Sequence, residues 1–281
     1  MSHDYTAQYR ASLDDPEAFW AEQARAVDWD RPWQQVIDAS DAPFYRWFAG
    51  GALNTCYNAL DRHVDGGRAD QAALIWESPV TGQTRTYSYA ELRDRVARLA
   101  GALRELGVEH GDRVIIYMPM VPEAAMAMLA CARIGAVHSV VFGGFAGPEL
   151  AKRIDDAEPR VIVSASCGIE PSGVVDYKSL LDEALRRSAH GIEHCLILQR
   201  EAQPCALEPG RDIDWQDALA AAAPTACVAV DANHPLYILY TSGTTGRPKG
   251  IVRDHGGHAV ALLWTMRNIY GVAPGEVMFT A

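Results

Sequence analysis

From about residue 73 onward, short apolar runs alternate with longer helix-like stretches, and this alternation limits the possible folds most strongly. The apolar runs carry Val, Ile and Leu at consecutive positions, which is typical of strands buried on both faces. Such strands, separated by helices, form mostly parallel sheets covered on both sides. We therefore expect an α/β fold with a mostly parallel sheet flanked by helices. The expected strands are residues 73–76, 85–87, 114–117, 139–142, 161–163, 195–198 and 236–240.

Local signals add detail to this pattern. The turn at residues 79–82 predicts a hairpin between the first two strands. Ser88 followed by Glu91 predicts a capping box, and leucines and Val96 then recur at helical spacing until Gly107. Residues 122–134 predict a second helix, closed by Gly135. The last residues, 275–281, read as a further strand.

The first 65 residues differ from the rest, because they are aromatic and hold most of the tryptophans. Asp15 and Pro16 predict a helix start, with Phe19, Trp20, Ala24 and Val27 on its inner face. We expect residues 1–65 to wrap the main domain rather than fold alone. Residues 66–281 then form the first part of that main domain.

Bulk properties exclude several classes of function. With 281 residues, 49% hydrophobic and 22% charged, the chain has an ordinary globular composition. Its net charge of -11 disfavours nucleic acid and anionic membranes as partners. No apolar run approaches the roughly 20 residues of a membrane span, and no secretory signal opens the chain. The six cysteines, irregularly spaced, are expected to be free thiols in the cytoplasm.

The decapeptide from Thr241 to Gly250, with the sequence TSGTTGRPKG, carries the strongest chemical signal. Two glycines permit close approach of the backbone to a ligand, while hydroxyl groups and Lys249 can contact phosphate oxygens. Two residues separate Gly243 from Gly246, whereas the common ATPase loop has four before its Gly-Lys-Ser/Thr, so a phosphate-loop ATPase or kinase is disfavoured. An ordinary surface turn is the alternative reading of the glycines and threonines alone.

Residues 240–250 resemble the phosphate-loop signature of the adenylate-forming enzymes, the superfamily of acyl-CoA synthetases, luciferases and peptide-synthetase adenylation domains. The run HSVVFGGF at residues 138–145 is similar to the acetyl- and propionyl-CoA synthetase branch. RDHGGHAV at residues 253–260 is most similar to propionyl-CoA synthetases. Further segments that carry the resemblance are residues 47–63, 111–119, 122–123 and 130–136.

The resemblance implies an acid–thiol ligase that uses ATP, Mg²⁺ and CoA. A short-chain carboxylate, propionate in preference to acetate, would attack ATP to give an acyl-adenylate and pyrophosphate, and CoA would then displace AMP. Catalysis of the first step consists mainly of positioning and charge stabilisation. The residues that the resemblance assigns to the ATP phosphates are Thr241, Ser242, Gly243, Thr244, Thr245, Gly246 and Lys249.

For CoA, the resemblance implies contacts from the turn Phe142, Gly143 and Gly144. A tight connection between a strand and a helix is the alternative reading of these glycines. Acetyl members of the branch carry two arginines further along, at positions that here hold Glu170, Pro171, Ser172 and Gly173. Because both arginines are missing, the carry-over to this second CoA segment is weak.

Relatives in this superfamily continue past residue 281, so we expect an N-terminal fragment. No catalytic residue is expected within it, because the catalytic lysine of the superfamily lies in a C-terminal domain. As an alternative, the fragment is a nucleotide-binding module without ligase activity of its own. No metal site of protein ligands is expected, and neither pair, His255/His258 or His190/His194, has a neighbouring cluster of carboxylates or cysteines. The sequence leaves the oligomeric state open.

Two features after the loop, an apolar stripe and Asp254, are expected to have structural rather than functional roles. Leu262, Leu263, Met266 and Ile269 are expected on the core face of a helix. Asp254 is expected in a turn or facing solvent rather than acting as a functional acid.

Overall fold

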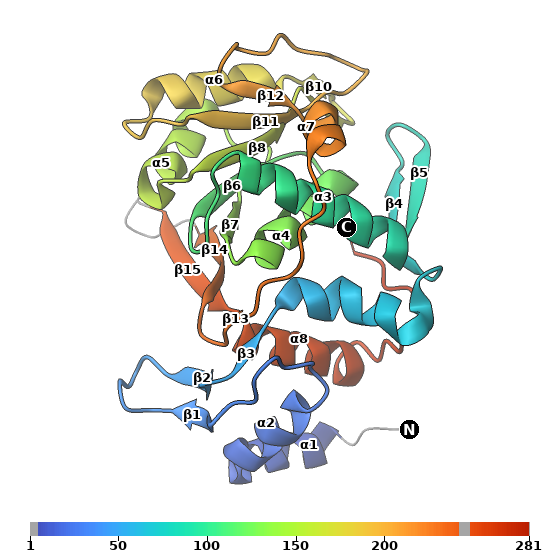
Figure 1. The fold of residues 1–281 in the computed structure, drawn as a ribbon, viewed down its shortest axis with the longest axis vertical. Coiled ribbons are helices and arrows are strands. Elements are labelled where there is room, and N and C mark those ends of the chain that lie inside the picture. Colours follow the sequence, from blue (N-terminus) through green and yellow to red (C-terminus); the bar gives the residue numbers. More distant parts are fainter. Residues whose placement is uncertain (1–4, 242–247, 281) are drawn as a thin grey trace.

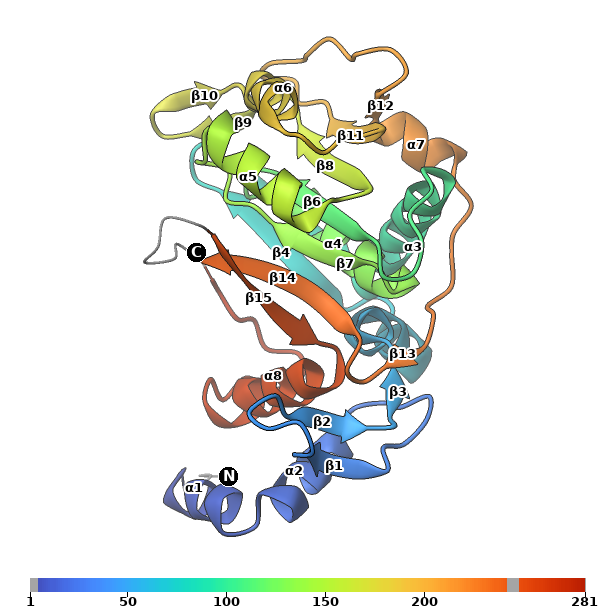
Figure 2. The ribbon, with the colours of Figure 1, turned by 90° about the vertical axis from the view of Figure 1, so that its left-hand side faces the viewer.

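The structure, a computed structural model, describes residues 5–241 and 248–280. Its centre is a seven-stranded sheet with the order β12-β11-β8-β6-β7-β14-β15 (Figures 1 and 2). Neighbouring strands run parallel except β14 and β15, so the expected α/β fold with a mostly parallel sheet is confirmed. The strands are β6 (Arg113–Tyr117), β7 (Val137–Val140), β8 (Val161–Ala165), β11 (His194–Leu198), β12 (Asp212–Asp214), β14 (Pro235–Thr241) and β15 (Lys249–Asp254).

Alternate residues of the central strands enter two separate cores, one on each face of the sheet. Ile116 and Val163 pack with α3, α4 and α7, whereas Ile115 and Ile162 pack with α5 and α6. Consecutive apolar residues are therefore needed, since both faces are buried. The helices of the two layers are α3 (Tyr89–Glu105), α4 (Pro122–Ile134), α5 (Gly147–Ala157), α6 (Tyr177–Arg187) and α7 (Trp215–Ala221).

The local predictions before the loop are confirmed. β4 (Ala72–Ser78) and β5 (Gln83–Ser88) form the predicted hairpin. The Ser88 hydroxyl accepts from the Glu91 amide at 3.2 Å, and the Glu91 carboxylate accepts from the Ser88 amide at 2.8 Å. α4 has the predicted bounds and ends at Gly135, which has a φ of 74°.

The N-terminal region packs its aromatic residues into a third core. Asp15 accepts from the Ala18 amide at the predicted helix start, and Phe19, Ala24 and Val27 are buried. This core meets the rest of the chain where β3 pairs with β13 and where α2 contacts α8 (Figure 2). The elements are α1 (Tyr5–Asp14), α2 (Pro16–Ala24), β1 (Gln35–Asp38), β2 (Arg46–Ala49), β3 (Ala52–Leu53), η1 (Tyr57–Asp61), η2 (Val64–Arg68), β13 (Val230–Asp231) and α8 (Gly256–Asn268).

The strand expected at residues 275–281 is absent from the described part, residues 275–280. Val277 and Phe279 in this segment are largely exposed. An apolar, β-branched pattern makes a strand only when a neighbouring strand satisfies its backbone groups. No described strand pairs with residues 275–280, so the prediction from the pattern was wrong.

Two predictions of burial near the loop were also partly wrong. Leu236 of β14 is buried, but Leu239 is half exposed, because successive side chains of a strand point to opposite faces. On α8, Val260 enters the third core with Leu263 beside it. Leu262 and Ile269 point away from that face and are about half exposed.

No helix in the described ranges combines the length and the apolar character that a membrane crossing requires. All six cysteines are free thiols, as predicted. Four of them are buried, and Cys205 and Cys227 are half-buried.

Candidate functional site

The segments predicted to contact phosphate and CoA follow two neighbouring strands of the sheet. β7 and β14 run parallel, so both end at the same edge. The Ser139 hydroxyl donates to the Ile238 carbonyl at 2.9 Å, which ties the two strands together. The turn after β7 and the loop after β14 therefore start side by side. This carboxyl edge of a parallel sheet is where open α/β folds bind ligands.

The predicted phosphate loop connects two paired strands. Thr241 ends β14, Lys249 begins β15, and the two residues are register partners. Both are exposed, as expected for side chains that meet a ligand. The candidates Ser242, Gly243, Thr244, Thr245 and Gly246 lie outside the described residues. The strand β15, which follows the loop, was not predicted from the sequence.

The predicted CoA turn is held from beneath by a buried tyrosine. A Cβ atom built on Gly143 would lie 1.6 Å from the Tyr177 hydroxyl oxygen, and one built on Gly144 would lie 2.5 Å from the Phe142 ring. Gly143 therefore excludes a side chain, because Tyr177 is buried, whereas a side chain at Gly144 would require the exposed Phe142 ring to move. The Phe145 amide donates to the Phe142 carbonyl at 3.0 Å, and Phe142 itself is 71% exposed. The turn is thus a tight strand-to-helix connection that also presents a largely exposed aromatic ring, edge-on to Phe145.

Two tyrosines and their hydrogen bonds reinforce this turn. The Tyr117 hydroxyl donates to the Phe145 carbonyl at 2.8 Å, and the Tyr117 and Tyr177 rings lie 4.9 Å apart. Burial raises the pKa of Tyr177 to about 12, so its hydroxyl stays protonated at neutral pH. Gly168 packs against the other side of Tyr177, with a built Cβ 2.6 Å from the ring. Tyr177 thereby connects the turn after β7 with the segment after β8.

The second predicted CoA segment is the tip of a short hairpin. Glu170 and Gly173 pair across the turn that joins β9 (Gly168–Glu170) to β10 (Gly173–Val175), with Pro171 and Ser172 between them. All four residues are exposed, and none is a cation. Since the base of this hairpin packs on Tyr177, the two predicted CoA segments share one support.

Arg153 on α5 lies between the CoA turn and the strand that leads into the phosphate loop. Its guanidinium carbon lies 4.4 Å from the centre of the Phe145 ring and 5.8 Å from that of Tyr240. It donates to the carbonyl and the carboxylate of Glu149. The side chain is only 5% exposed, so it is a fixed cation near this edge of an acidic protein.

Tyr240 is fixed by a second residue of α5. Its hydroxyl donates to the Asp156 carboxylate at 2.5 Å. Burial, followed by this hydrogen bond, raises the pKa of Tyr240, so the phenol remains a neutral donor. Tyr117, Arg153, Asp156 and Tyr177 were not predicted as site residues. No spacing in the sequence links them, because they come together only when β6, α5 and α6 meet.

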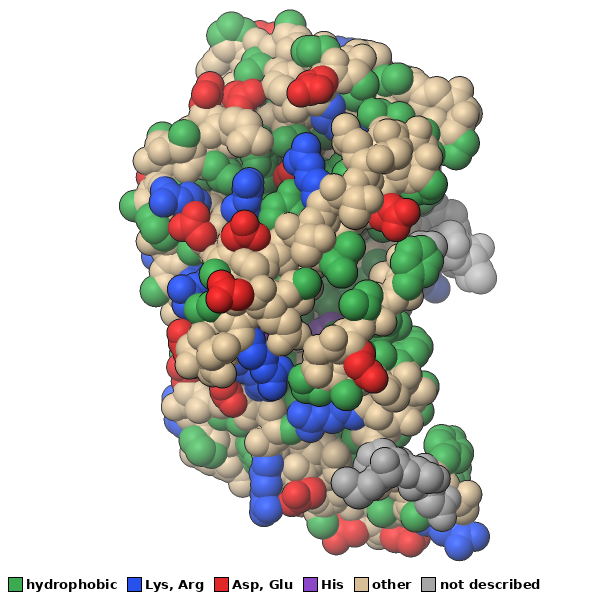
Figure 3. All heavy atoms as spheres, turned by 90° about the vertical axis from the view of Figure 1, so that its right-hand side faces the viewer, with side chains coloured by type: hydrophobic (Ala, Val, Ile, Leu, Met, Phe, Trp, Pro, Cys, Tyr) green, Lys and Arg blue, Asp and Glu red, His purple; other side chains and the backbone are tan. Residues whose placement is uncertain are grey.

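Two cavities in the described part of the chain lie elsewhere. A cavity of about 680 Å³ lies between β5, α3 and α7 and contains Arg85, Arg95 and Arg98. A cavity of about 350 Å³ lies beside Asp61 and Arg133. Figure 3 shows the face of the molecule opposite to the one in Figure 2. Neither includes a residue predicted to contact ATP or CoA, so the assignment of the carboxyl edge rests on strand topology and local packing.

The histidines after the loop, His255 and His258, contact other side chains of the protein. His255 shares a 2.8 Å hydrogen bond with Thr55, and its ring stacks on His234. His258 lies edge-on to Tyr237. Asp254 accepts from the His258 amide at 3.2 Å, and burial raises its pKa. Asp254 is the last residue of β15, where it pairs with Pro235, and it is half-buried, so the expected turn or solvent-facing position was wrong.

Comparison with known proteins adds an independent finding. The sequence model of the AMP-binding enzyme family matches residues 60–281, and that of the acetyl-coenzyme A synthetase N-terminus matches residues 5–59. The human mitochondrial acyl-CoA synthetase short-chain family member 3 is 50% identical over 99% of this chain and 41% of its own length. Propionate–CoA ligase of Escherichia coli is 47% identical over 97% of this chain and 44% of its own.

A solved structure supports the same conclusion. Acetoacetyl-CoA synthetase from Streptomyces lividans superposes with a TM-score of 0.87 at 31% identity, covering 97% of this chain and 41% of that one. The fold is therefore that of the N-terminal part of adenylate-forming enzymes. The chain belongs to the AMP-binding enzyme family, with short-chain acyl-CoA synthetases as its relatives. It spans about two fifths of the length of these relatives.

Proposed function

We propose that the protein containing this chain joins a short-chain carboxylate, preferably propionate, to CoA through an acyl-adenylate, releasing AMP and pyrophosphate. The observation that carries the proposal is that β14, which ends at Thr241 where the loop begins, and β7, which leads into the Phe142–Gly144 turn, end at the same carboxyl edge of the sheet. The similarity to propionate–CoA ligase and to a short-chain acyl-CoA synthetase supports the substrate class.

The chemistry requires two groups of residues. Carboxylates are poor electrophiles, so the acid is activated by bonding to the α-phosphorus of ATP, with pyrophosphate as the leaving group. Hydroxyls and backbone amides of residues 241–246, with the cation of Lys249, would hold the β- and γ-phosphates in line together with Mg²⁺. Threonine hydroxyls and phosphate oxygens suit Mg²⁺, which prefers oxygen ligands.

The CoA thiol then displaces AMP. Phe142, Gly143 and Gly144 would lie against CoA, because the exposed ring and the absence of side chains permit close approach. The tip at Glu170–Gly173 offers backbone and hydroxyl contacts only, since it holds no cation. Tyr177 supports both segments.

The alternative is that this chain by itself binds nucleotide without ligating anything. Two fifths of the length of its relatives is present, and no catalytic residue was predicted within it. The two proposals differ in one measurement. We expect the product of the complete reading frame to exchange labelled pyrophosphate into ATP only when a short carboxylate is added. Exchange independent of any acid, or release of γ-phosphate alone, would point to an ATPase.

Lys249 offers a sharper test within the same assay. Lys249→Ala should weaken the use of ATP by about 10-fold to 100-fold, because a charged hydrogen bond to phosphate contributes about 1.5–3 kcal/mol. Circular dichroism should be unchanged, since Lys249 is exposed. Lys152→Ala, which removes an exposed lysine of α5, is the matched control. Equal ATP kinetics in the two variants would remove Lys249 from the site.

The remaining assignments accompany this proposal. Residues 1–65 would serve as the extension of the acyl-CoA synthetase, and residues 66–281 as the first part of the adenylation domain. We propose the cytoplasm as the compartment and small molecules as the partners: the carboxylate, ATP and CoA. The free thiols of all six cysteines support a reducing compartment.

A further inference from the structure

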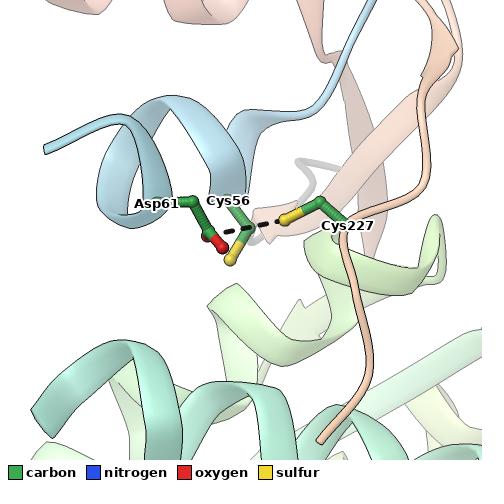
Figure 4. Close-up of side chains that lie close together, drawn as sticks. All are labelled: Cys56, Asp61 and Cys227. Atoms are coloured by element: carbon green, nitrogen blue, oxygen red, sulfur yellow. Dashed lines mark hydrogen bonds between the residues drawn. The ribbon is translucent and has the colours of Figure 1, made fainter. Parts of the chain in front are cut away.

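We propose that Cys56 and Cys227 form a reversible disulfide when the protein meets hydrogen peroxide, with Cys227 oxidised first and Cys56 as the resolving thiol. This inference does not depend on the ligase function. It rests on a cluster between the N-terminal region and the main sheet, formed by Cys56, Asp61 and Cys227, which Figure 4 shows, together with Arg133.

The two sulfur atoms are close although the residues are far apart in the sequence. Cys56 immediately precedes η1, and Cys227 lies in the irregular segment 222–229 between α7 and β13. Both Sγ atoms and one carboxylate oxygen of Asp61 lie within 4.8 Å of one another. A disulfide bond is about 2.05 Å long, so the two sulfur atoms must approach each other by at most about 2.7 Å to bond.

Hydrogen bonds hold the two backbone segments together. Asn54, two residues before Cys56, donates through its side-chain amide to the Val228 carbonyl at 2.7 Å. The amides of Thr225 and Val228 donate to the carbonyls of Ala97 and Arg133. The chain is thus anchored on both sides of Cys227. Pre-positioned thiols lose less conformational freedom on bonding than freely moving ones.

Arg133 and Asp61 give the thiols a polar environment. The Arg133 guanidinium lies 3.0 Å from the Cys227 sulfur and forms a paired contact with the Asp61 carboxylate at 2.7 and 2.9 Å. The Cys227 thiol donates to the same carboxylate at 3.6 Å. Asp61 and Arg133 thus orient the Cys227 sulfur through one hydrogen bond each.

The same arrangement argues against a metal ion. Two sulfurs and a carboxylate are ligands that zinc accepts. Here the buried guanidinium already contacts all three groups, with its side chain 6% exposed. A metal cation would have to displace it and leave a buried charge without partners, which is costly. Oxidation needs no such displacement.

Access differs between the two thiols, which sets the order of oxidation. Cys56 is fully buried, whereas Cys227 is half-buried. The cavity of about 350 Å³ is lined by Asp61 and Arg133, which contact the Cys227 sulfur, and by Thr225 and Ala226, which precede Cys227 in the chain. A peroxide molecule is small enough to enter. The hydrogen bond with Cys56, together with burial, raises the pKa of Cys227, so oxidation should be faster at alkaline than at neutral pH.

The reaction balances in two steps. The Cys227 sulfur attacks one peroxide oxygen, the O–O bond breaks, and sulfenic acid and water form. The Cys56 sulfur then attacks the sulfenic sulfur, the S–O bond breaks, and the disulfide and a second water form. Two thiols lose two electrons and two protons, and one peroxide is reduced to two waters. A dithiol reductant reverses the change by thiol–disulfide exchange.

Peptide mapping of the folded chain tests the proposal. The chain is treated with hydrogen peroxide, alkylated and digested without reductant. We expect one cross-linked peptide pair that contains Cys56 and Cys227 and is about 2 Da lighter than the two free peptides. Dithiothreitol should restore both thiols. Separate over-oxidation of the two cysteines, or a cross-link between other cysteines, would overturn the proposal.

Three variants identify the roles. Cys56→Ala should abolish the cross-link and leave a sulfenic acid at Cys227, which dimedone traps. Cys227→Ala should abolish both products. Cys205→Ala, which removes the other half-buried thiol, should leave the cross-link unchanged. If Zn²⁺ at about equimolar concentration protects Cys56 and Cys227 from alkylation, the cluster is a metal site and the proposal fails.

Discussion

At the scale of single residues, the space around Gly143 is the most restrictive in the candidate site. A methyl group there would overlap the Tyr177 hydroxyl, and Tyr177 is buried against Tyr117. We expect Gly143→Ala to lower the free energy of unfolding by about 1–3 kcal/mol, because overpacked cores must shift backbone or rotamers. Urea unfolding of the two proteins measures the difference.

Gly191 provides the matched control. No atom lies within 4 Å of a Cβ built on Gly191. Gly191→Ala should therefore change the free energy of unfolding by less than about 0.5 kcal/mol. If Gly143→Ala and Gly191→Ala behaved alike, Tyr177 would not be the fixed support described above.

Two buried histidines predict a loss of stability in acid. Burial, with minor contributions from neighbouring histidines, lowers the pKa of His138 and of His255 to about 3. The unfolded chain, with an ordinary histidine pKa near 6.5, binds these protons first. Stability is therefore complete above about pH 6.5 and falls as the pH drops toward 3, by up to about 1.4 kcal/mol per pH unit for each histidine.

Thermal unfolding between pH 7.5 and 5.0 measures this slope. His138→Gln should flatten the slope in part, because burial also lowers the pKa of His63, His234 and His258, as it does that of His255. His190→Gln, at a half-buried histidine that bonds the Pro159 carbonyl, is the control. A slope that stays unchanged in His138→Gln would assign the acid sensitivity to other groups.

At the scale of elements, the start of α3 depends on one hydroxyl. Ser88 and Glu91 satisfy each other's backbone amides there. Ser88→Ala should cost about 1 kcal/mol of the free energy of unfolding, whereas Ser88→Asp, which keeps a cap, should cost much less. Guanidinium unfolding of both variants compares them. Equal losses would mean that the cap hydrogen bond contributes little to α3.

The elements differ in how well the sequence predicted them. The bounds of β6 and α4 were predicted nearly to the residue. For α4 the reason is local, because Pro122 begins the helix and Gly135 ends it. β15 and the β9–β10 hairpin were missed. Their residues are glycine-rich or charged, and they are strands because a neighbour pairs with them. The segment at residues 275–280 is the opposite case, an apolar pattern without a described partner.

At the scale of the whole molecule, Asn54 joins three distant parts of the chain. Its side-chain amide, 1% exposed, donates to the carbonyls of Ala132, Arg133 and Val228. Asn54→Asp would replace the donating amide group with a carboxylate oxygen, which would then face three carbonyl oxygens without a hydrogen to share. We expect a loss of about 3 kcal/mol or more in the free energy of unfolding, larger than that of Asn54→Ala.

Hydrogen exchange locates the effect. Amides of β3 and β13 should exchange faster in Asn54→Asp, because these strands pair where Asn54 joins the N-terminal region to the sheet. Asn268→Asp, on the last turn of α8, is the control. Unchanged protection of β3 and β13 would show that Asn54 does not hold this junction.

The sequence by itself determined the α/β class, the local helix ends and the family, because these depend on short-range patterns and on one motif. Tertiary structure alone decided which side chains meet at the site. Arg153 lies between Phe145 and Tyr240, and Tyr177 lies beneath Gly143, through the packing of α5 and α6 on the sheet. Cys56 likewise meets Cys227 only when the N-terminal region docks. Such contacts depend on long-range packing, which leaves no periodic signal along the chain.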